Sequence, residues 1–383
     1  MLKNKKIEII KDFPVSNVCD VEIENKEIPV LSFSPSPKGG PECLWFYFKV
    51  KTLGIKKIKL ILKHSYNMLG GGKPENFRPV IKFGKNDWQR MSEGKIIENK
   101  DGRKFLLWDI DILNEIFEIA FCYPYGKKEL YELIKESKNY WKKDVIGISQ
   151  EEREIIRLSN NYGDINKKGV YLIARQHSGE TPGSWVLDGF LRYLYEIKDD
   201  NLVVWAVPLS NIDGIENGYY GKDNFPYDLN RAWGSPPMRH ETLVIQRDIM
   251  RWEERCIPFL AIDFHAPGAS EIDGAYFYIT SIEKDEKQHK IEKEIAEKLG
   301  KKIGKYMSKN YIRSINYKSR WETPHFTDFI RENIKIPSLS MEIPYCICGN
   351  TIMKKEDYKK IGKKMALCII EEIEKNGNKN RNI

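Results

Sequence analysis

The feature that most restricts the fold of this chain is a series of short apolar runs separated by segments of helical length. The runs are VYLIA (170–174), NLVVWAVPL (201–209), FLAIDFHA (259–266), AYFYIT (275–280) and SLSMEIPY (338–345). Unbroken runs of this kind are typical of strands that are buried on both faces of a sheet. Helical spacing of apolar residues is seen in 182–198, 238–255, 282–308 and 352–375. This pattern predicts an α/β domain, with a mixed sheet flanked by helices.

The first 145 residues have a different pattern, with short β-branched or aromatic runs separated by turn residues. These runs are LWFYFKV (44–50), KIKLILKH (57–64), RPVIKFG (78–84) and KFLLWDI (104–110). Several short strands at this spacing predict a β-sandwich. Because 383 residues exceed one ordinary domain, we expect a β-sandwich domain over 1–145, the α/β domain over 146–376 and a flexible tail over 377–383.

Composition indicates a globular protein and excludes several functions. Hydrophobic residues make up 41% of the chain and charged residues 31%, and no apolar stretch approaches the roughly 20 residues of a membrane span. The first residues have too short an apolar run for a signal peptide, so we expect a cytoplasmic protein without a membrane partner. The net charge of +8 comes largely from scattered lysines, without a nucleic-acid motif, so no nucleic-acid partner is expected. The oligomeric state stays open.

Seven cysteines are spread widely, and only Cys346 and Cys348 form a close pair. A zinc knuckle requires a second pair at similar spacing. The sequence therefore favours buried thiols over a structural metal site at the cysteines.

His177 and Glu180 stand three residues apart directly after the first apolar run. Thr181 and Pro182 follow as a helix cap and a proline at the first helical position, so the pair lies between a strand and a helix. Ligand sites collect at this edge of an open α/β sheet because loops converge there and helix N-termini add positive potential. The pair is interpreted either as metal ligands or as the polar part of a capped, solvated turn.

A second histidine, His265, ends the run at 259–266. If that strand reaches the same edge, His265 joins His177 and Glu180 in a set of two imidazoles and one carboxylate. Such a set leaves a fourth position for water and suits catalytic zinc. The chain contains only six histidines, so two of them at strand ends beside carboxylates favour this interpretation. The alternative for His265 is a core or edge histidine with a structural hydrogen bond.

Residues 211–234 (NIDGIENGYYGKDNFPYDLNRAWG) are rich in glycine, asparagine and aspartate. A loop of this length inside a compact domain usually has a function. Near its end, Asn230 and Arg231 place an amide beside a guanidinium, a pair that can grip a carboxylate. Taken alone, this dipeptide indicates little.

These stretches resemble, in type and order, the zinc carboxypeptidase family (carboxypeptidase A-like), and most closely its cytosolic carboxypeptidase branch. The segments that carry the resemblance are HSGE with SWVLDGFLRYL, NIDG, DLNRAW, DFHA and SLSMEIPY. The family reads approximately HPGE, NPDG, DLNR, D-x-H and a strand that ends in the catalytic glutamate. LWFYFKV and AFCYPYG (120–126) are similar to parts of the β-sandwich that precedes the catalytic domain in that branch. The resemblance covers nearly the whole chain.

The resemblance implies a metal centre with one zinc ion. His177, Glu180 and His265 match the three zinc ligands of the family. Asp228 matches an acid that orients the first histidine, the kind of partner that fixes the tautomer of a ligand.

The resemblance also implies how a substrate is held and cleaved. Asn230 and Arg231 match the pair that holds the terminal carboxylate, so hydrolysis would occur one residue from a C-terminus. Glu342 matches the general base and acid, which takes a proton from water activated by zinc and passes it to the leaving amine. Without the resemblance, Glu342 would be interpreted as a structural carboxylate at a strand end.

The chain departs from the cytosolic branch in the NPDG loop. The branch has Gly-Asn-Tyr-Arg there, with an arginine that stabilises the oxyanion, whereas this chain has GYYGK (218–222). We predict that Lys222 replaces the arginine, because the glycines at 218 and 221 would let the backbone deliver a side chain one position further on. The alternative for Lys222 is a solvated loop lysine.

A second departure concerns specificity. The branch has an arginine upstream of the catalytic glutamate that recognises glutamate side chains, whereas this chain has His325, Phe326, Thr327 and Asp328 in that region. We therefore expect neutral or basic C-terminal residues to be released faster than acidic ones.

Together these features predict a zinc metallocarboxypeptidase, a hydrolase and metalloprotease acting on the C-terminal peptide bond, or an isopeptide-like amide, of a peptide or protein. The first alternative is an N-acyl amino acid amidohydrolase of the desuccinylase/aspartoacylase type, which shares the ligand pattern. A β-rich N-terminal domain speaks against it. The second alternative is a non-catalytic carboxylate-binding relative, although the matches to the ligands and to Glu342 speak against that.

Overall fold

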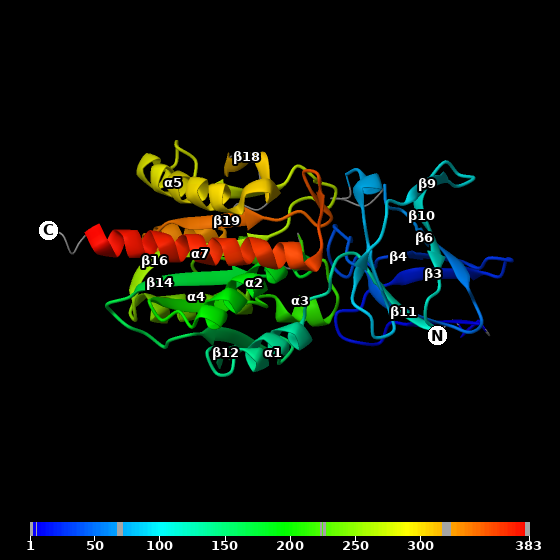
Figure 1. The fold of residues 1–383 in the computed structure, drawn as a ribbon, viewed down its shortest axis with the longest axis horizontal. Coiled ribbons are helices and arrows are strands. Elements are labelled where there is room, and N and C mark those ends of the chain that lie inside the picture. Colours follow the sequence, from blue (N-terminus) through cyan, green and yellow to red (C-terminus); the bar gives the residue numbers. More distant parts are fainter. Residues whose placement is uncertain are drawn as a thin grey trace.

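The computed structural model describes residues 6–66, 72–222, 224, 227–315 and 323–375, and the backbone of 3–4 and 376–379. Figure 1 shows two parts side by side: the strands of the first 120 residues at one end, and a large sheet with its helices at the other.

The N-terminal part consists of two sheets. The six-stranded sheet has the order β1 (Lys3–Asn4), β2 (Ile7–Ile10), β5 (Tyr47–Thr52), β11 (Ile116–Ala120), β7 (Val80–Phe83) and β8 (Gln89–Arg90). The five-stranded sheet has the order β3 (Cys19–Glu24), β4 (Val30–Ser34), β6 (Lys57–Leu62), β10 (Lys104–Asp111) and β9 (Lys95–Glu98). Phe48 of the first sheet meets Phe33 of the second edge to face, with ring centroids 4.8 Å apart. The sheets therefore pack on each other through apolar inner faces, as the predicted sandwich requires.

The C-terminal part is built on one eight-stranded sheet. Its order is β12 (Lys142–Ile148), β13 (Glu154–Ser159), β15 (Leu202–Val207), β14 (Lys168–Ala174), β16 (Ile257–His265), β19 (Ser338–Glu342), β17 (Ala275–Ile279) and β18 (Met307–Ser314). The four strands β15, β14, β16 and β19 run parallel, whereas β12, β13 and β15 alternate in direction and β17 is antiparallel to β19. Every residue of β15 is buried, which explains its unbroken apolar run.

Helices flank this sheet (Figure 1). The α-helices are α1 (Lys127–Glu136), α2 (Thr181–Ile197), α3 (Ile212–Glu216), α4 (His240–Glu253), α5 (Glu286–Ile303), α6 (Phe326–Phe329) and α7 (Lys355–Lys379). The other short elements are η1 (Pro74–Asn76), η2 (Leu229–Arg231), η3 (Gly304–Tyr306), the π-helical turn η4 (Ile330–Ile334), β20 (Ile347–Cys348) and β21 (Thr351–Ile352).

The helices α2 and α7 cross in close contact at two glycines. A Cβ on Gly189 would lie 2.2 Å from the backbone oxygen of Lys359, and one on Gly362 would lie 1.9 Å from that of Val186. Any side chain at either position would force the helices apart. This crossing fixes α2, whose first residue directly follows Glu180.

The N-terminal sheets contact the segments that carry predicted site residues. Asn17 donates a hydrogen bond of 2.8 Å to the carbonyl of Gly218, four residues before Lys222. Arg90 donates one of 2.9 Å to the carbonyl of Tyr345, three residues after Glu342. The two parts therefore share an interface that includes segments next to Lys222 and Glu342 in the chain.

The predicted fold class is confirmed, with a β-sandwich before a mixed sheet flanked by helices. The boundary predicted after residue 145 falls inside β12, which pairs with β13, so we propose a boundary before Lys142. Helix α7 continues to Lys379, into the segment predicted as a tail, and 380–383 lie outside the described residues.

All seven cysteines are free thiols, five of them buried. Among the described residues, none of the helices has the length and apolar character to cross a membrane.

Candidate metal and catalytic site

The C-terminal ends of β16 and β19 bring four polar side chains to one face of the sheet. Parallel pairing sets His265 opposite Glu342 and Asp263 opposite Ser340. Side chains of a strand alternate between the two faces, so these four share a face while the intervening Phe264 is fully buried on the other. All four polar residues line the same pocket.

The antiparallel strand β17 extends this face. It sets Tyr276 opposite Glu342 and Tyr278 opposite Ser340, and both tyrosines line the pocket. The pocket wall therefore has an outer layer with His265, Glu342 and Tyr276, and an inner layer two residues deeper along each strand.

His177 and Glu180 lie in the short turn between β14 and α2. The amide of Glu180 donates to the carbonyl of His177 at 3.1 Å, which closes the turn, and the amide of Gly179 donates to the carbonyl of Tyr220 at 2.6 Å. Both ligand candidates are buried, with Glu180 0% exposed. The turn is thus held by its own backbone and by the loop that contains Lys222.

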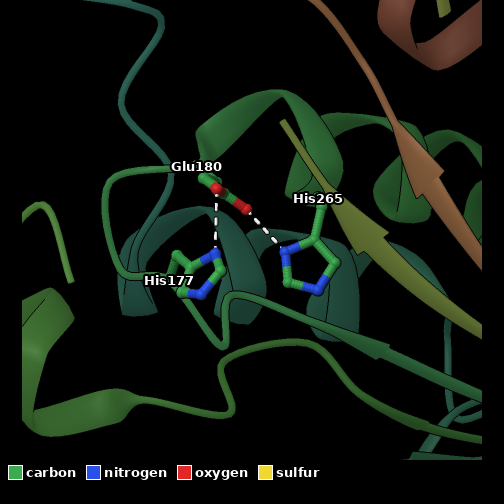
Figure 2. Close-up of side chains that lie close together, drawn as sticks. All are labelled: His177, Glu180 and His265. Carbon is green, nitrogen blue, oxygen red and sulfur yellow. Dashed lines mark hydrogen bonds and ion pairs between the residues drawn. The ribbon is translucent and has the colours of Figure 1, made fainter. Parts of the chain in front are cut away.

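The three predicted ligands meet at one point. Figure 2 shows the Glu180 carboxylate between the two imidazoles, with Oε1 2.9 Å from Nδ1 of His177 and Oε2 2.7 Å from Nδ1 of His265. One ligand atom from each residue lies within 4.8 Å of the others. This set of donors could hold a metal ion.

The outer nitrogens of both histidines are bound by acids. Nε2 of His177 lies 3.0 Å from Oδ1 of Asp228, and Nε2 of His265 lies 2.6 Å from Oδ2 of Asp263. A carboxylate at Nε2 accepts the N–H there and leaves Nδ1 as the ligand atom. Both imidazoles are therefore oriented with Nδ1 toward Glu180.

Lys222 reaches the same cluster from the loop after α3. Its Nζ lies 2.9 Å from Oε1 of Glu180 and 3.2 Å from the carbonyl of Ala266, and it lines the pocket. The preceding Gly221 has φ +87°, and a Cβ there would lie 2.4 Å from the amide nitrogen of Ser178. Glycine is thus required for the close contact between the two loops that brings Lys222 into the pocket.

Asn230 and Arg231 lie in η2 and both line the pocket. Asp228 caps η2 by accepting from the amide of Asn230 at 2.8 Å. The Asn230 amide group lies 3.0 Å from Nε2 of His265. The residues of the DLNR motif therefore contact both predicted histidine ligands.

Comparisons with known proteins find similar chains among the carboxypeptidases. No protein-family model matches the chain. Cytosolic carboxypeptidase 6 of Mus musculus is 27% identical over 228 residues, which cover 52% of this chain and 41% of that protein. Cytosolic carboxypeptidase 1 of Homo sapiens is 28% identical over 196 residues, which cover 44% of this chain and 16% of that protein. The chain spans less than half of the length of these curated relatives.

Solved metallo-carboxypeptidases share the fold. The enzyme from Burkholderia cenocepacia superposes with a TM-score of 0.78 at 18% identity, covering 97% of this chain and 99% of that one. The enzyme from Pseudomonas aeruginosa, solved with (2-guanidinoethylmercapto)succinic acid, has a TM-score of 0.72 at 17% identity, covering 95% and 99%. The chain is thus similar in sequence to cytosolic carboxypeptidases and in fold to metallo-carboxypeptidases. This confirms the resemblance on which the site residues were predicted.

The two carboxylates of the site have opposite pKa shifts. Burial would raise the pKa of Glu180, but Lys222 and the two histidines outweigh it and hold that pKa well below its usual range. Burial raises the pKa of Glu342 to about 7, against an opposing effect of His265. Oε2 of Glu342 is buried and has no hydrogen-bond partner among the described residues.

In the region expected to recognise the side chain of the substrate, the Asp328 carboxylate does not face the pocket. The Asp328 carboxylate turns to His325 at 2.6 Å and to Lys284 at 2.9 Å, and Asp328 is not among the residues that line the pocket. His325 and Thr327 do line it. Of the upstream segment of this region, residues 320–322 lie outside the described residues.

Several pocket residues were given no role from the sequence: Asp263, Glu271, Tyr276, Tyr278 and Ser340. Most of them could have been found from the sequence, because residues two positions apart in a strand lie on the same face of the sheet. Asp263 and Ser340 stand two residues before His265 and Glu342, and the two tyrosines alternate on β17. The sequence contains no comparable signal for Glu271, which lies in a loop.

Proposed function

We propose that the protein is a zinc-dependent metallocarboxypeptidase that hydrolyses the C-terminal peptide bond, or an isopeptide-like amide, of a peptide or protein. The observation that carries the proposal is the convergence of two imidazole Nδ1 atoms and one carboxylate in the same pocket as the unpartnered oxygen of Glu342. The proposal is also supported by the relation to the carboxypeptidases. Because the curated relatives are named cytosolic, we propose the cytoplasm as its location.

The donor set fits a catalytic zinc ion. Zinc takes imidazole nitrogen and carboxylate oxygen, and catalytic sites combine three protein ligands with one open position. We propose His177, Glu180 and His265 as these ligands, and Asp228 with Asp263 as the acids that orient the imidazoles. When bound there, zinc would act as a Lewis acid toward the scissile carbonyl and the attacking water.

The reacting groups of the chain would divide the remaining tasks. Glu342 would accept the proton of the attacking water on its buried oxygen and then donate it to the leaving amine. Asn230 and Arg231 would hold the terminal carboxylate of the substrate. Lys222, whose ammonium is close to Glu180, would stabilise the negative charge that develops on the former carbonyl oxygen.

One assay tests the proposed function. The purified protein, loaded with zinc, is incubated with peptide libraries and with N-acyl amino acids, and the products are identified by mass spectrometry. We expect single C-terminal residues to be released by the wild type, and not by a Glu342→Gln protein loaded in the same way. Products from N-acyl amino acids alone would indicate the amidohydrolase alternative. Binding of peptides without any product would indicate a non-catalytic relative.

A further inference from the structure

Arg175 begins the turn that carries two of the predicted ligands, and its conformation is unusual. It follows β14 directly and stands two residues before His177. Its φ is +66°, in the left-handed region that residues other than glycine seldom adopt and that costs free energy. The residue is 1% exposed. A strained and fully buried arginine at this position calls for a specific set of contacts.

The guanidinium of Arg175 binds three different segments of the chain. Nε donates to the carbonyl of Ser178 at 2.8 Å, and Nη2 donates to the same carbonyl. Nη1 donates to the carbonyl of Tyr125 at 2.7 Å and to Oγ of Ser184 at 3.2 Å. Ser178 lies between the two ligand candidates His177 and Glu180. The side chain thus grips the ligand turn from behind and ties it to α2 and to the segment before α1.

Among the described residues, the Arg175 guanidinium has only uncharged hydrogen-bond partners. A buried charge is costly unless it is well bound, and the planar fork of a guanidinium can donate to several fixed acceptors at once. An ammonium is a point donor with a different reach. The geometry therefore requires arginine specifically, which makes the contact testable by conservative substitution.

The anchor at Tyr125 is itself firmly held. Its hydroxyl donates to Asp188 at 3.2 Å, and its ring meets Trp185 of α2 at 4.9 Å between centroids. Tyr125 stands in the segment that connects β11 with α1. Through Arg175, the position of the ligand turn therefore depends on the junction between the two parts of the molecule.

We infer that Arg175 is a positioning residue for the metal: it holds the His177–Glu180 turn in the geometry that binds the ion. The inference rests on the proposed function, because it requires a metal at this turn. Arg175 does not touch the substrate pocket, so it acts through His177 and Glu180. A residue that served the fold alone would affect stability without changing the metal affinity of the folded protein.

The test measures metal affinity in Arg175→Lys and Arg175→Gln. The zinc dissociation constant is obtained by competition with a chelator, the absorption spectrum of the cobalt(II)-loaded protein reports the ligand geometry, and thermal unfolding reports stability. We expect zinc affinity to fall about 10–100-fold, the range for loss of a residue that supports a metal ligand, with an altered cobalt spectrum. The glutamine variant should bind zinc more weakly than the lysine variant.

Arg157→Lys is the matched control. Arg157 is another buried arginine, on β13 of the sheet that Arg175 follows, and it pairs with Asp144 and Asp248 rather than with the ligand turn. We expect this variant to lose stability and to keep the zinc affinity of the wild type.

Three results would overturn the inference. One is a folded Arg175 variant whose zinc affinity stays within about twofold of the wild type. The second is an equal loss of affinity in Arg157→Lys. The third is failure of both Arg175 variants to fold, which would assign the residue to the fold alone. A folded wild type that binds no zinc would instead refute the proposed function.

Discussion

The pocket has two sides whose residues are held in different ways. On the strand side, His265, Glu342 and Tyr276 are aligned by the backbone pairing of β16, β19 and β17. On the loop side, Lys222 and Arg231 come from the long segment 211–234, where side-chain hydrogen bonds and glycine contacts set the path. Backbone pairing fixes distances more rigidly than loop contacts do. We therefore expect metal binding and proton transfer to depend on the strand side. Charge stabilisation and substrate binding should depend on the loop side.

The largest effect is expected where the strand side supplies a metal ligand. His265→Ala should lower the zinc content from about one ion per chain to well below that and abolish turnover, since one of three protein ligands is lost. Asn230→Ala is the control from the loop side, because its amide contacts the same imidazole without being a proposed ligand. Metal analysis that finds equal zinc in wild type and His265→Ala would remove the ligand assignment.

The second prediction separates binding from chemistry on the strand side. Glu342→Gln keeps shape and hydrogen bonding but cannot accept a proton, so kcat should fall about 10²-fold or more while zinc is retained. Glu271→Gln changes another carboxylate of the pocket and should have a much smaller effect. Steady-state kinetics decide the question. If Glu342→Gln turns over like the wild type, the base lies elsewhere.

The third prediction tests the loop side. Lys222→Met should lower kcat about 100-fold with zinc retained, by analogy with the loss of one oxyanion donor, and Lys222→Arg should restore part of it. Measurements use saturating substrate, with zinc content determined in parallel because Lys222 also contacts Glu180. An unchanged kcat in Lys222→Met would mean that stabilisation of the oxyanion depends on zinc or on another residue. It would also show that Lys222 of the loop side does not stabilise that charge.

The smallest expected effect concerns specificity. Asp263 and Ser340 form the inner layer of the strand side, and the only arginine that lines the pocket within the described residues is Arg231. Peptides ending in neutral or basic residues should be cleaved several-fold faster than those ending in glutamate. Ser340→Lys should shift the ratio of kcat/KM toward glutamate about tenfold, because it adds a cation to the inner layer. Preferential release of glutamate by the wild type would contradict the prediction.

The difference between the two sides also explains what the sequence could predict. Strand ends and the period of two are local properties, so His265 and Glu342 could be placed at an edge of the sheet from the sequence. The pairing that sets His265 opposite Glu342 joins segments far apart in the chain, and the resemblance to a family was needed to bring them together. The edge strand β12 was missed because it is half-exposed and carries several polar residues, and its neighbour β13 was missed with it.

Loop geometry was harder to predict because it depends on contacts with other segments. Asp328 was expected near the pocket, but His325 and Lys284 turn its carboxylate away. Arg175 could have been a second candidate for the oxyanion charge, yet its guanidinium points to Ser178 and Tyr125. In both cases one partner is three residues away, and the other, Lys284 or Tyr125, is distant in sequence.

The position of β19 has a consequence for biosynthesis. This strand is the last of the eight to be made, yet it lies between β16 and β17 inside the sheet. During translation the domain therefore has a gap at its centre until residues 338–342 leave the ribosome, and closing it requires pairing between distant segments, which is slow. The two histidines and Glu180 precede the gap, whereas Glu342 is part of the strand that fills it. A nascent chain would thus possess every proposed metal ligand before it possessed the proposed base, and the proposed hydrolytic activity could begin only after residues 338–342 have paired.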